Sequence, residues 1–114
     1  MTTSLVIGDY EITAVSDGSS LPRDPSTVFP DVPPEAWDPY RSIALTVDGK
    51  WHPDWRGHLI RSTSGEGPTI LVDAGMGDVV NEQTGERGKL LDCLADLGVQ
   101  PEDIDIVVTT HCHG

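Results

Sequence analysis

Residues 69–77, TILVDAGMG, and residues 104–113, IDIVVTTHCH, are the two stretches that decide the fold of this chain. Each is a short apolar run that ends in polar residues, as strands in the middle of a sheet do. The last strand is apolar on both faces, which predicts a buried, parallel strand. Between them, residues 86–97 place four leucines on one helical face, and Gly98 suits the position just past the helix end. The order strand, helix, strand predicts a βαβ unit.

The two stretches end at the same predicted edge of the sheet. In parallel units the ligand site lies beyond the carboxyl ends of the strands. His111 and His113 are at i and i+2, so in an extended chain both imidazoles project to one side and can reach one cation. Because a catalytic zinc generally takes three protein ligands and a water, the pair alone is not decisive. A polar tail that happens to carry two histidines is the alternative.

The N-terminal third predicts a hairpin followed by a long loop. Residues 5–16, LVIGDYEITAVS, alternate as a half-buried hairpin broken at Gly8-Asp9, with Tyr10, Ile12 and Ala14 on one side. Asp17-Gly18 predicts a turn. Residues 19–40 are rich in proline and show no periodicity, which predicts a functional or disordered loop.

Two further short strands are expected at residues 43–47 and 57–62, separated by turn signals. The aromatic side chains of Phe29, Trp37, Trp51 and Trp55 either line a substrate entrance or cover the sheet. His52 is expected to be solvated in a turn, and His58 to occupy a strand edge.

Composition restricts the classes of partner. The chain has 114 residues, enough for one small domain, and 19 acidic residues against 7 basic ones give a net charge of −12. Such a surface repels nucleic acid and anionic membranes. We find no signal peptide and no apolar run of the roughly 20 residues that a membrane helix needs, so the expected location is the cytoplasm. Cys93 and Cys112 are expected as free thiols, with Cys112 pointing into the fold as a small buried hydrophobe.

The combination of ILVDAGMG, an amphipathic helix and LGVQPEDIDIVVTTHCHG resembles the metallo-β-lactamase-fold hydrolases, and most nearly their lactonase and organophosphate-hydrolase-like branch. In that superfamily a strand runs into an H-x-H-x-D-H ligand motif that usually follows Ser or Thr. The resemblance implies an α+β fold, the N-terminal part of an αβ/βα sandwich, with mostly strands and one amphipathic helix near residues 86–97. Residues 1–114 would then be an incomplete single domain.

The resemblance also implies the site. His111 and His113 match ligands of the first metal, and Asp73 matches an aspartate that holds ligands in place by hydrogen bonds. For Asp73, a cap of the turn at residues 74–77 is the alternative. The cofactor would be Zn²⁺, two ions in the full-length enzyme, with manganese or iron also compatible. A bridging water deprotonated near neutral pH would attack ester, lactone or phosphotriester bonds of a small molecule.

The sequence stops where the motif's Asp-His would follow, so we expect the 114-residue chain by itself to be inactive and marginally folded. Two alternatives stay open. One is a small acidic, non-enzymatic domain whose histidines bind metal weakly or not at all. The other is a glyoxalase-II-like thioester hydrolase, against which the proline-rich segment before residue 41 counts.

Overall fold

The computed structural model describes residues 3–113, which form two compact units. The first unit combines Met1–Gly18 with Trp55–Gly114, and the second is Ser19–Asp54. Within the described residues no helix is both long and apolar enough to cross a membrane.

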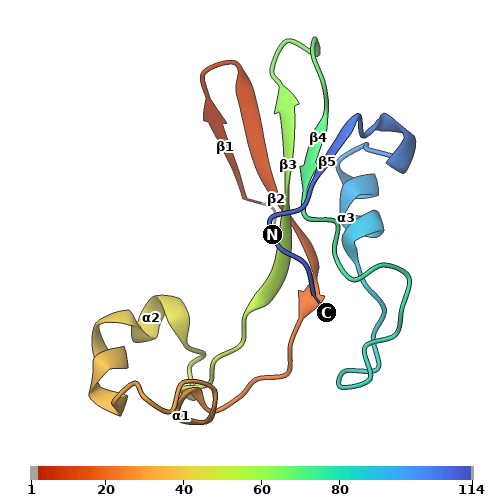
Figure 1. Ribbon diagram of the computed structural model, residues 1–114. Helices are drawn as coiled ribbons and strands as arrows, with labels where there is room; N and C mark the ends of the chain where they lie inside the picture. Colours follow the sequence, from red (N-terminus) through yellow and green to blue (C-terminus); the bar gives the residue numbers. More distant parts are fainter. Residues whose placement is uncertain (1–2, 114) are drawn as a thin grey trace. The chain divides into compact units, whose positions relative to one another are not determined.

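The first unit is built on a five-stranded sheet in the order β1-β2-β3-β4-β5 (Figure 1). Strands β1 and β2 form the expected antiparallel hairpin, β3 and β4 are antiparallel, and β4 and β5 are parallel. The mixed sheet confirms the α+β class. The strands are Ser4–Ile7, Tyr10–Ser19, Asp54–Ser62, Ile70–Val72 and Ile106–Val108.

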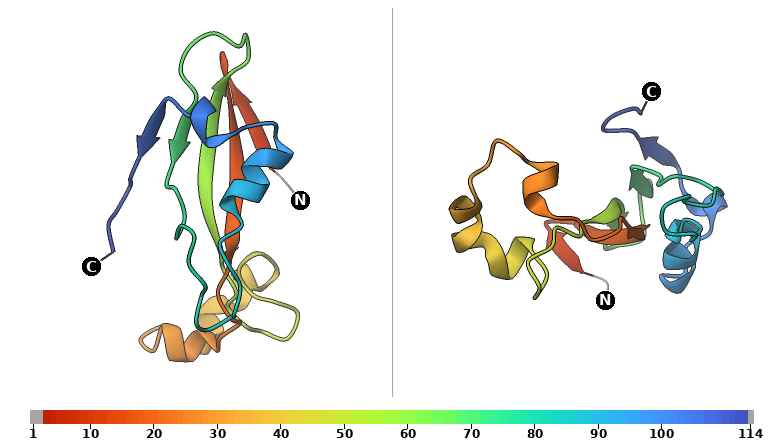
Figure 2. Two further views of the ribbon diagram at one scale, coloured as in Figure 1. Left: turned by 90° about the vertical axis from the view of Figure 1, so that its right-hand side faces the viewer. Right: turned by 90° about the horizontal axis from the view of Figure 1, so that it is seen from below.

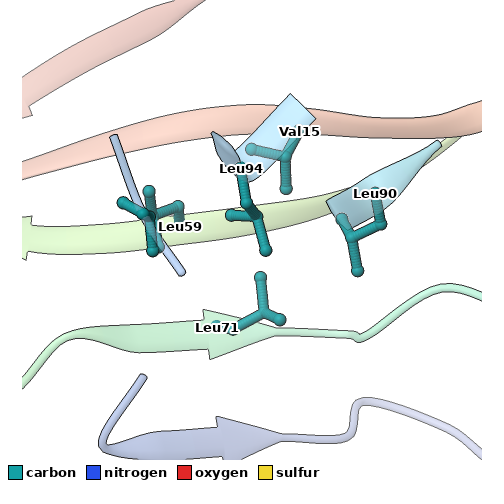
Figure 3. Close-up of a cluster of buried hydrophobic side chains, with 6 residues drawn as sticks. Val15, Leu59, Leu71, Leu90 and Leu94 are labelled. Atoms are coloured by element: carbon teal, nitrogen blue, oxygen red, sulfur yellow. The ribbon is translucent and has the colours of Figure 1, made fainter. Parts of the chain in front are cut away.

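Helix α3, Leu90–Asp96, connects β4 to β5 together with the short 3-10 turn η2, Pro101–Asp103. The helix lies against one face of the sheet (Figure 2). Its Leu90 and Leu94 side chains meet residues from three strands in the hydrophobic core (Figure 3). Burying aliphatic side chains of this size stabilises the fold by about 1.5–3 kcal/mol each. The core consists of Val15, Leu59, Leu71, Leu90, Leu94 and Val99.

Helix α3 is shorter than the predicted helix over residues 86–97. It ends as expected, with Gly98 at a left-handed φ of 76° just past the C-cap. The helix begins at Leu90, four residues after the predicted start, because an acceptor from another part of the chain binds its first N–H group. The N–H of Leu90 donates to Asp17 Oδ1 at 3.0 Å, whereas Lys89 at the N-cap offers no side-chain acceptor.

Asp17 is the buried carboxylate that organises this unit. Strand β2 continues through the predicted turn at Asp17-Gly18, so Asp17 lies inside the fold with 4% of its surface exposed. Its Oδ2 atom accepts a second hydrogen bond, at 2.8 Å, from the N–H of Met76. A Cβ atom added to Gly75 or Gly88 would come within 2.6 Å of this carboxylate. Both glycines therefore allow the backbone to close around Asp17.

Replacing Asp17 by Ala leaves two backbone N–H groups without their acceptor. We expect the free energy of unfolding to fall by about 2–4 kcal/mol, since each unsatisfied buried donor costs about 1–3 kcal/mol. Urea denaturation measures the change. The control is Asp96→Ala at the exposed end of α3, where an effect within about 0.5 kcal/mol is expected. Equal stability of the two variants would contradict the role of Asp17.

The sheet face away from α3 is apolar and exposed, and we call it the open face. It carries Leu5, Ile7, Tyr10, Ile106 and Val108, which are between 43% and 61% exposed. The prediction that the last strand is buried is therefore wrong for the described chain. Among residues 3–113, strand β5 lies at the edge of the sheet and pairs with β4 alone.

An apolar face of this extent predicts that the 114-residue chain by itself self-associates and binds the dye ANS. Replacing Leu5 and Ile7 together by Thr should reduce both effects, because threonine keeps β-propensity and lowers apolar area. Light scattering and ANS fluorescence measure them. The control is Leu91→Thr, a change at an exposed leucine on α3. A sharp, reversible two-state melt without dye binding would contradict this prediction.

The second unit is more regular than the predicted proline-rich loop. It contains α1, Pro25–Val28, the 3-10 helix η1, Pro34–Tyr40, and α2, Arg41–Ala44. Proline stands at the first position of α1 and of η1, where its fixed φ suits a helix and its missing N–H removes no bond. Asp24 caps α1 by accepting from the N–H of Ser26 at 2.9 Å.

The predicted strand at residues 43–47 is wrong. Its first residues belong to α2, and Thr46 begins a turn that closes on Lys50 through a backbone hydrogen bond of 2.8 Å. The aromatic residues of this unit pack on one another, with Phe29 in ring contact with Trp37 at 5.6 Å and with Trp51 at 5.2 Å. This cluster gives a short segment a small core of its own.

Candidate metal centre

The parallel pairing of β4 and β5 brings the two predicted site stretches together. Ile70, Leu71 and Val72 stand opposite Ile106, Val107 and Val108. The pairing continues past both strands, because the N–H of Asp73 donates to the carbonyl of Val108 at 2.8 Å. Asp73 and the residues after Val108 therefore leave the sheet side by side at its carboxyl edge.

Asp73 holds Thr110 with both oxygens of its carboxylate. Oδ1 accepts from the backbone N–H of Thr110 at 2.9 Å, and Oδ2 accepts from the Thr110 hydroxyl at 2.7 Å. The hydroxyl hydrogen bond, followed by the backbone one, holds the pKa of Asp73 below its usual value, and charge on His111 and His58 lowers the pKa further. The carboxylate is consequently ionised at neutral pH and acts only as an acceptor.

The two histidines extend this arrangement outward. The Thr110 hydroxyl lies 2.8 Å from Nδ1 of His111, and Nε2 of His111 lies 3.0 Å from Nε2 of His113. The ring centroids are 4.8 Å apart with an interplanar angle of 71°. Both side chains are exposed, so a cation can reach the nitrogens from solvent.

The separation of the two Nε2 atoms suits one metal ion. Two nitrogens bound to the same zinc at about 2.0–2.1 Å stand about 3.3 Å apart in a tetrahedral arrangement. The observed 3.0 Å is close to that value. Within residues 3–113, no group of three or more His, Cys, Asp or Glu side chains could hold a metal ion. The described residues thus offer two candidate ligands, fewer than the three that catalytic zinc sites generally use.

Gly57 is a supporting residue that the sequence analysis missed. A Cβ atom at this position would lie 2.4 Å from the carbonyl oxygen of Asp73 and 2.8 Å from that of Val72. The close approach of β3 lets Asp73 take a left-handed backbone conformation, with a φ of 62°. A glycine at the start of a short strand was the available signal, since it often marks a place where another backbone passes closely.

Gly57→Ala should push the Asp73 backbone away from β3. We expect the free energy of unfolding to fall by about 1–3 kcal/mol, as for other insertions into packed sites. Thermal and urea unfolding followed by circular dichroism measure the loss. His58→Ala at the adjacent, exposed position of β3 is the control and should change stability by less than about 0.5 kcal/mol. A Gly57→Ala protein as stable as this control would show that the close approach is not needed.

Two expectations for individual residues, the burial of Cys112 and the edge position of His58, are wrong, and the alternative reading of Asp73 as a turn cap does not hold. Cys112 is exposed rather than buried, because the chain that carries it has left the edge strand β5; it and Cys93 are free thiols, as expected. The cap of the turn at residues 74–77 is Asp17, whereas the carboxylate of Asp73 binds Thr110. His58 lies within β3, the middle strand of five, rather than at an edge.

The fold and this arrangement agree with the comparisons to known proteins. A model of the metallo-beta-lactamase superfamily matches residues 58–114, which is half of the chain. The chain belongs to the metallo-beta-lactamase superfamily.

Two curated relatives match part of the chain. Metallo-beta-lactamase domain-containing protein 1 of Mus musculus is 36% identical over 74 residues, and the protein of the same name from Rattus norvegicus is 34% identical over 74 residues. Each alignment covers 63% of this chain, but only 28% and 30% of the respective relatives. The chain thus spans less than a third of their length.

Solved structures confirm the fold over nearly the whole chain. A probable metal-dependent hydrolase from Staphylococcus aureus matches 96% of it with a TM-score of 0.69 and 24% identity. The hydrolase AbOPH of the beta lactamase superfamily matches 98% of the chain with a TM-score of 0.69 and 25% identity. AidC, a dizinc quorum-quenching lactonase, matches 98% with a TM-score of 0.70 and 21% identity. The alignments cover 40%, 36% and 36% of those chains. The sheet and α3 are therefore the N-terminal part of the metallo-beta-lactamase sandwich.

Proposed function

We propose that this chain supplies the first metal-binding segment of a metal-dependent hydrolase that acts on ester, lactone or phosphotriester bonds of small molecules. The observation that carries the proposal is the convergence of His111 Nε2 and His113 Nε2, 3.0 Å apart at the carboxyl edge of β5. In an open α/β sheet this edge is where ligands bind. Zinc is the metal expected at such imidazole ligands in a hydrolase, with manganese or iron as alternatives.

The solved relatives support the reaction class. One neighbour is described as a dizinc lactonase in complex with a product, and the other two as hydrolases. In the bound state, metal ions of this kind activate a water molecule and polarise the substrate oxygen under attack. The acidic chain would receive neutral or weakly charged substrates more readily than polyanions.

The residues of the chain have separate roles in this proposal. His111 and His113 would hold the ion with their imidazole nitrogens. Asp73 touches neither imidazole in the hydrogen-bond pattern and instead orients His111 through Thr110. Outer partners of this kind typically contribute 10–100-fold to metal affinity. Because the described residues provide two ligands, the 114-residue chain by itself is expected to bind zinc weakly and to hydrolyse none of these substrates.

Variants of the natural protein that carries this chain test the proposal. His111→Ala and His113→Ala should each lose bound metal and hydrolytic activity by more than the roughly 10–100-fold expected for an outer partner. Cys112→Ser, between the two histidines and exposed, is the matched control and should retain both. Metal content by elemental analysis distinguishes zinc, manganese and iron.

The substrate class is tested with three probes: a γ-lactone, p-nitrophenyl acetate and diethyl p-nitrophenyl phosphate. Hydrolysis of at least one, abolished by a chelator and restored by metal, is the expected result. A protein that holds metal through His111 and His113 but hydrolyses none of the three would contradict the reaction class. Metal content unchanged in both alanine variants would contradict the site itself and favour a non-enzymatic acidic domain.

A further inference from the structure

The second unit contains a concave pocket of about 330 Å³. Its lining residues all lie between Asp24 and Lys50, so the pocket belongs to this unit alone. The volume is at the lower end of the range of about 300–1,000 Å³ that small-molecule sites occupy. The lining includes the apolar side chains of Val32, Trp37 and Leu45. The pocket therefore has the size and the apolar surface to hold a small organic molecule.

Two carboxylates line the pocket, and each is held through one of its oxygens. Oδ1 of Asp24 accepts hydrogen bonds from the N–H and the hydroxyl of Ser26, at 2.9 and 2.7 Å. Oδ1 of Asp48 accepts from the Thr46 hydroxyl at 2.6 Å. These hydroxyl hydrogen bonds are the main reason that the pKa of each carboxyl lies below its usual value, so both groups are ionised at neutral pH. No other residue among 3–113 donates a hydrogen bond to either Oδ2 atom, and both can accept one from a ligand.

Two cationic side chains, Arg41 and Lys50, line the same pocket. Nε of Arg41 donates to Asp38 at 2.9 Å, and the two terminal nitrogens of the guanidinium form no hydrogen bond within the described chain. Besides the hydroxyl hydrogen bonds, the charge of Lys50 also lowers the pKa of both pocket carboxyls, so its ammonium lies within electrostatic range of each. Lys50 nevertheless forms no ion pair with either of them in the described part of the chain. Asp24 and Asp48 thus share the pocket with two cations that form no ion pair with them.

The turn over residues 46–50 holds these groups in place. The N–H of Thr46 donates to the carbonyl of Lys50 at 2.8 Å, and the N–H of Lys50 donates to the Thr46 hydroxyl oxygen at 2.9 Å. Gly49 takes a left-handed φ of 79° in this turn, and a Cβ atom there would lie 3.9 Å from Nη1 of Arg41. The guanidinium therefore lies beside the turn that carries Asp48 and Lys50.

Trp37 gives the pocket a fixed apolar wall. Its ring contacts Phe29 at 5.6 Å, and Phe29 in turn contacts Trp51 at 5.2 Å. Trp51 is paired with Arg23 through two backbone hydrogen bonds of 2.8 and 2.9 Å. The small aromatic core of the unit therefore holds the indole in place, and a ligand does not have to order it on binding.

We propose that this pocket binds a small zwitterion with an apolar body, of the class of the free α-amino acids. The ammonium group of the ligand binds the carboxylates of Asp24 and Asp48. Its carboxylate binds Arg41 and Lys50 through charge-assisted hydrogen bonds. The apolar body of the ligand lies against Trp37.

The balance of charge in the pocket selects this class of ligand. A monocation leaves Arg41 and Lys50 without an acceptor, and a monoanion leaves Asp24 and Asp48 without a donor. The net charge of −12 of the chain disfavours a monoanion further. The inference does not depend on the proposed metal site, because that site contributes no residue to the pocket.

The direct test is isothermal titration calorimetry of the natural protein with a matched series of ligands. L-leucine and L-phenylalanine are zwitterions, L-leucinamide lacks the carboxylate, and N-acetyl-L-leucine lacks the ammonium. We expect at least one of the two amino acids to bind, and leucinamide and N-acetyl-leucine to bind at least about 10-fold more weakly than leucine, since each leaves charged groups of the pocket unpaired. No binding of either amino acid at about 10 mM, or equal binding of leucine and leucinamide, would overturn the proposal.

Substitutions in the pocket test the assignment of the charged groups. Lys50→Gln should weaken leucine binding by at least about 10-fold and leave leucinamide binding unchanged, because only leucine carries the carboxylate that Lys50 binds. The control is Lys89→Gln, a change at the other lysine of the chain, which is exposed and pairs with Glu86 outside the pocket. Thermal unfolding of both variants reports whether they fold. Leucine affinity that is the same in Lys50→Gln and Lys89→Gln would contradict the role of Lys50.

Asp48→Asn tests the opposite end of the ligand, since asparagine still offers an oxygen to the Thr46 hydroxyl and loses the charge. Leucine and leucinamide should both bind at least about 10-fold more weakly, whereas N-acetyl-leucine should not. Asp31→Asn, at an exposed position of the same unit outside the pocket lining, is the control and should change none of the three.

One further variant separates this pocket from the proposed metal site. Amino acids also bind zinc through nitrogen and oxygen atoms, so leucine binding is repeated with His111→Ala. Unchanged leucine affinity supports the pocket, and loss of leucine binding would place the amino acid at the metal and overturn the inference. A protein that binds leucine but holds no metal through His111 removes the proposed function and leaves this inference intact.

Discussion

The pairing of β4 with β5 is the constraint on which the site depends. Two parallel strands of three residues each would be a weak anchor, but their hydrogen-bond pattern continues beyond the strands through the N–H of Asp73 and then through its carboxylate to Thr110. The backbone after β5 is thereby tied to the backbone after β4. His111 and His113 come directly after Thr110 in the chain. The hydrogen bonds between Thr110 and Asp73 therefore hold both imidazoles at the edge of the sheet, and their convergence is not that of a flexible tail.

Local pattern was sufficient to predict most of the elements of the first unit. The hairpin at the N-terminus, the strands at residues 57–62 and 69–73 and the amphipathic helix all have periodicities that the structure confirms. The start of the helix was not predictable, because its acceptor is Asp17, far away in sequence and hidden in what resembles a turn signal. The exposure of β5 also escaped prediction, since apolar composition on both faces shows what a strand prefers and not what covers it.

The proximity of the three candidate site residues was predictable from the sequence. The i, i+2 separation of His111 and His113 and the resemblance to the family placed Asp73 beside them, and the structure brings the three together. The contacts of Thr110 and Gly57 were not predicted. The motif includes a Ser or Thr before its first histidine, but it does not show that the Thr110 hydroxyl binds Asp73. Gly57 acts through an absent side chain, which leaves no periodic pattern in the sequence. In the second unit, helices of four to seven residues are too short to produce a periodic signal.

The left-handed backbone of Asp73 narrows the set of residues that can stand at this position. A φ of 62° is readily adopted by glycine and tolerated by asparagine and aspartate, but it strains most other side chains. Glycine would keep the backbone and lose the carboxylate, and asparagine would present an amide NH₂ to one of the two donors of Thr110. Glutamate would keep the charge, but its side chain is longer and it does not readily adopt a positive φ. Aspartate is therefore the residue that both tolerates the left-handed backbone at this position and accepts both hydrogen bonds from Thr110.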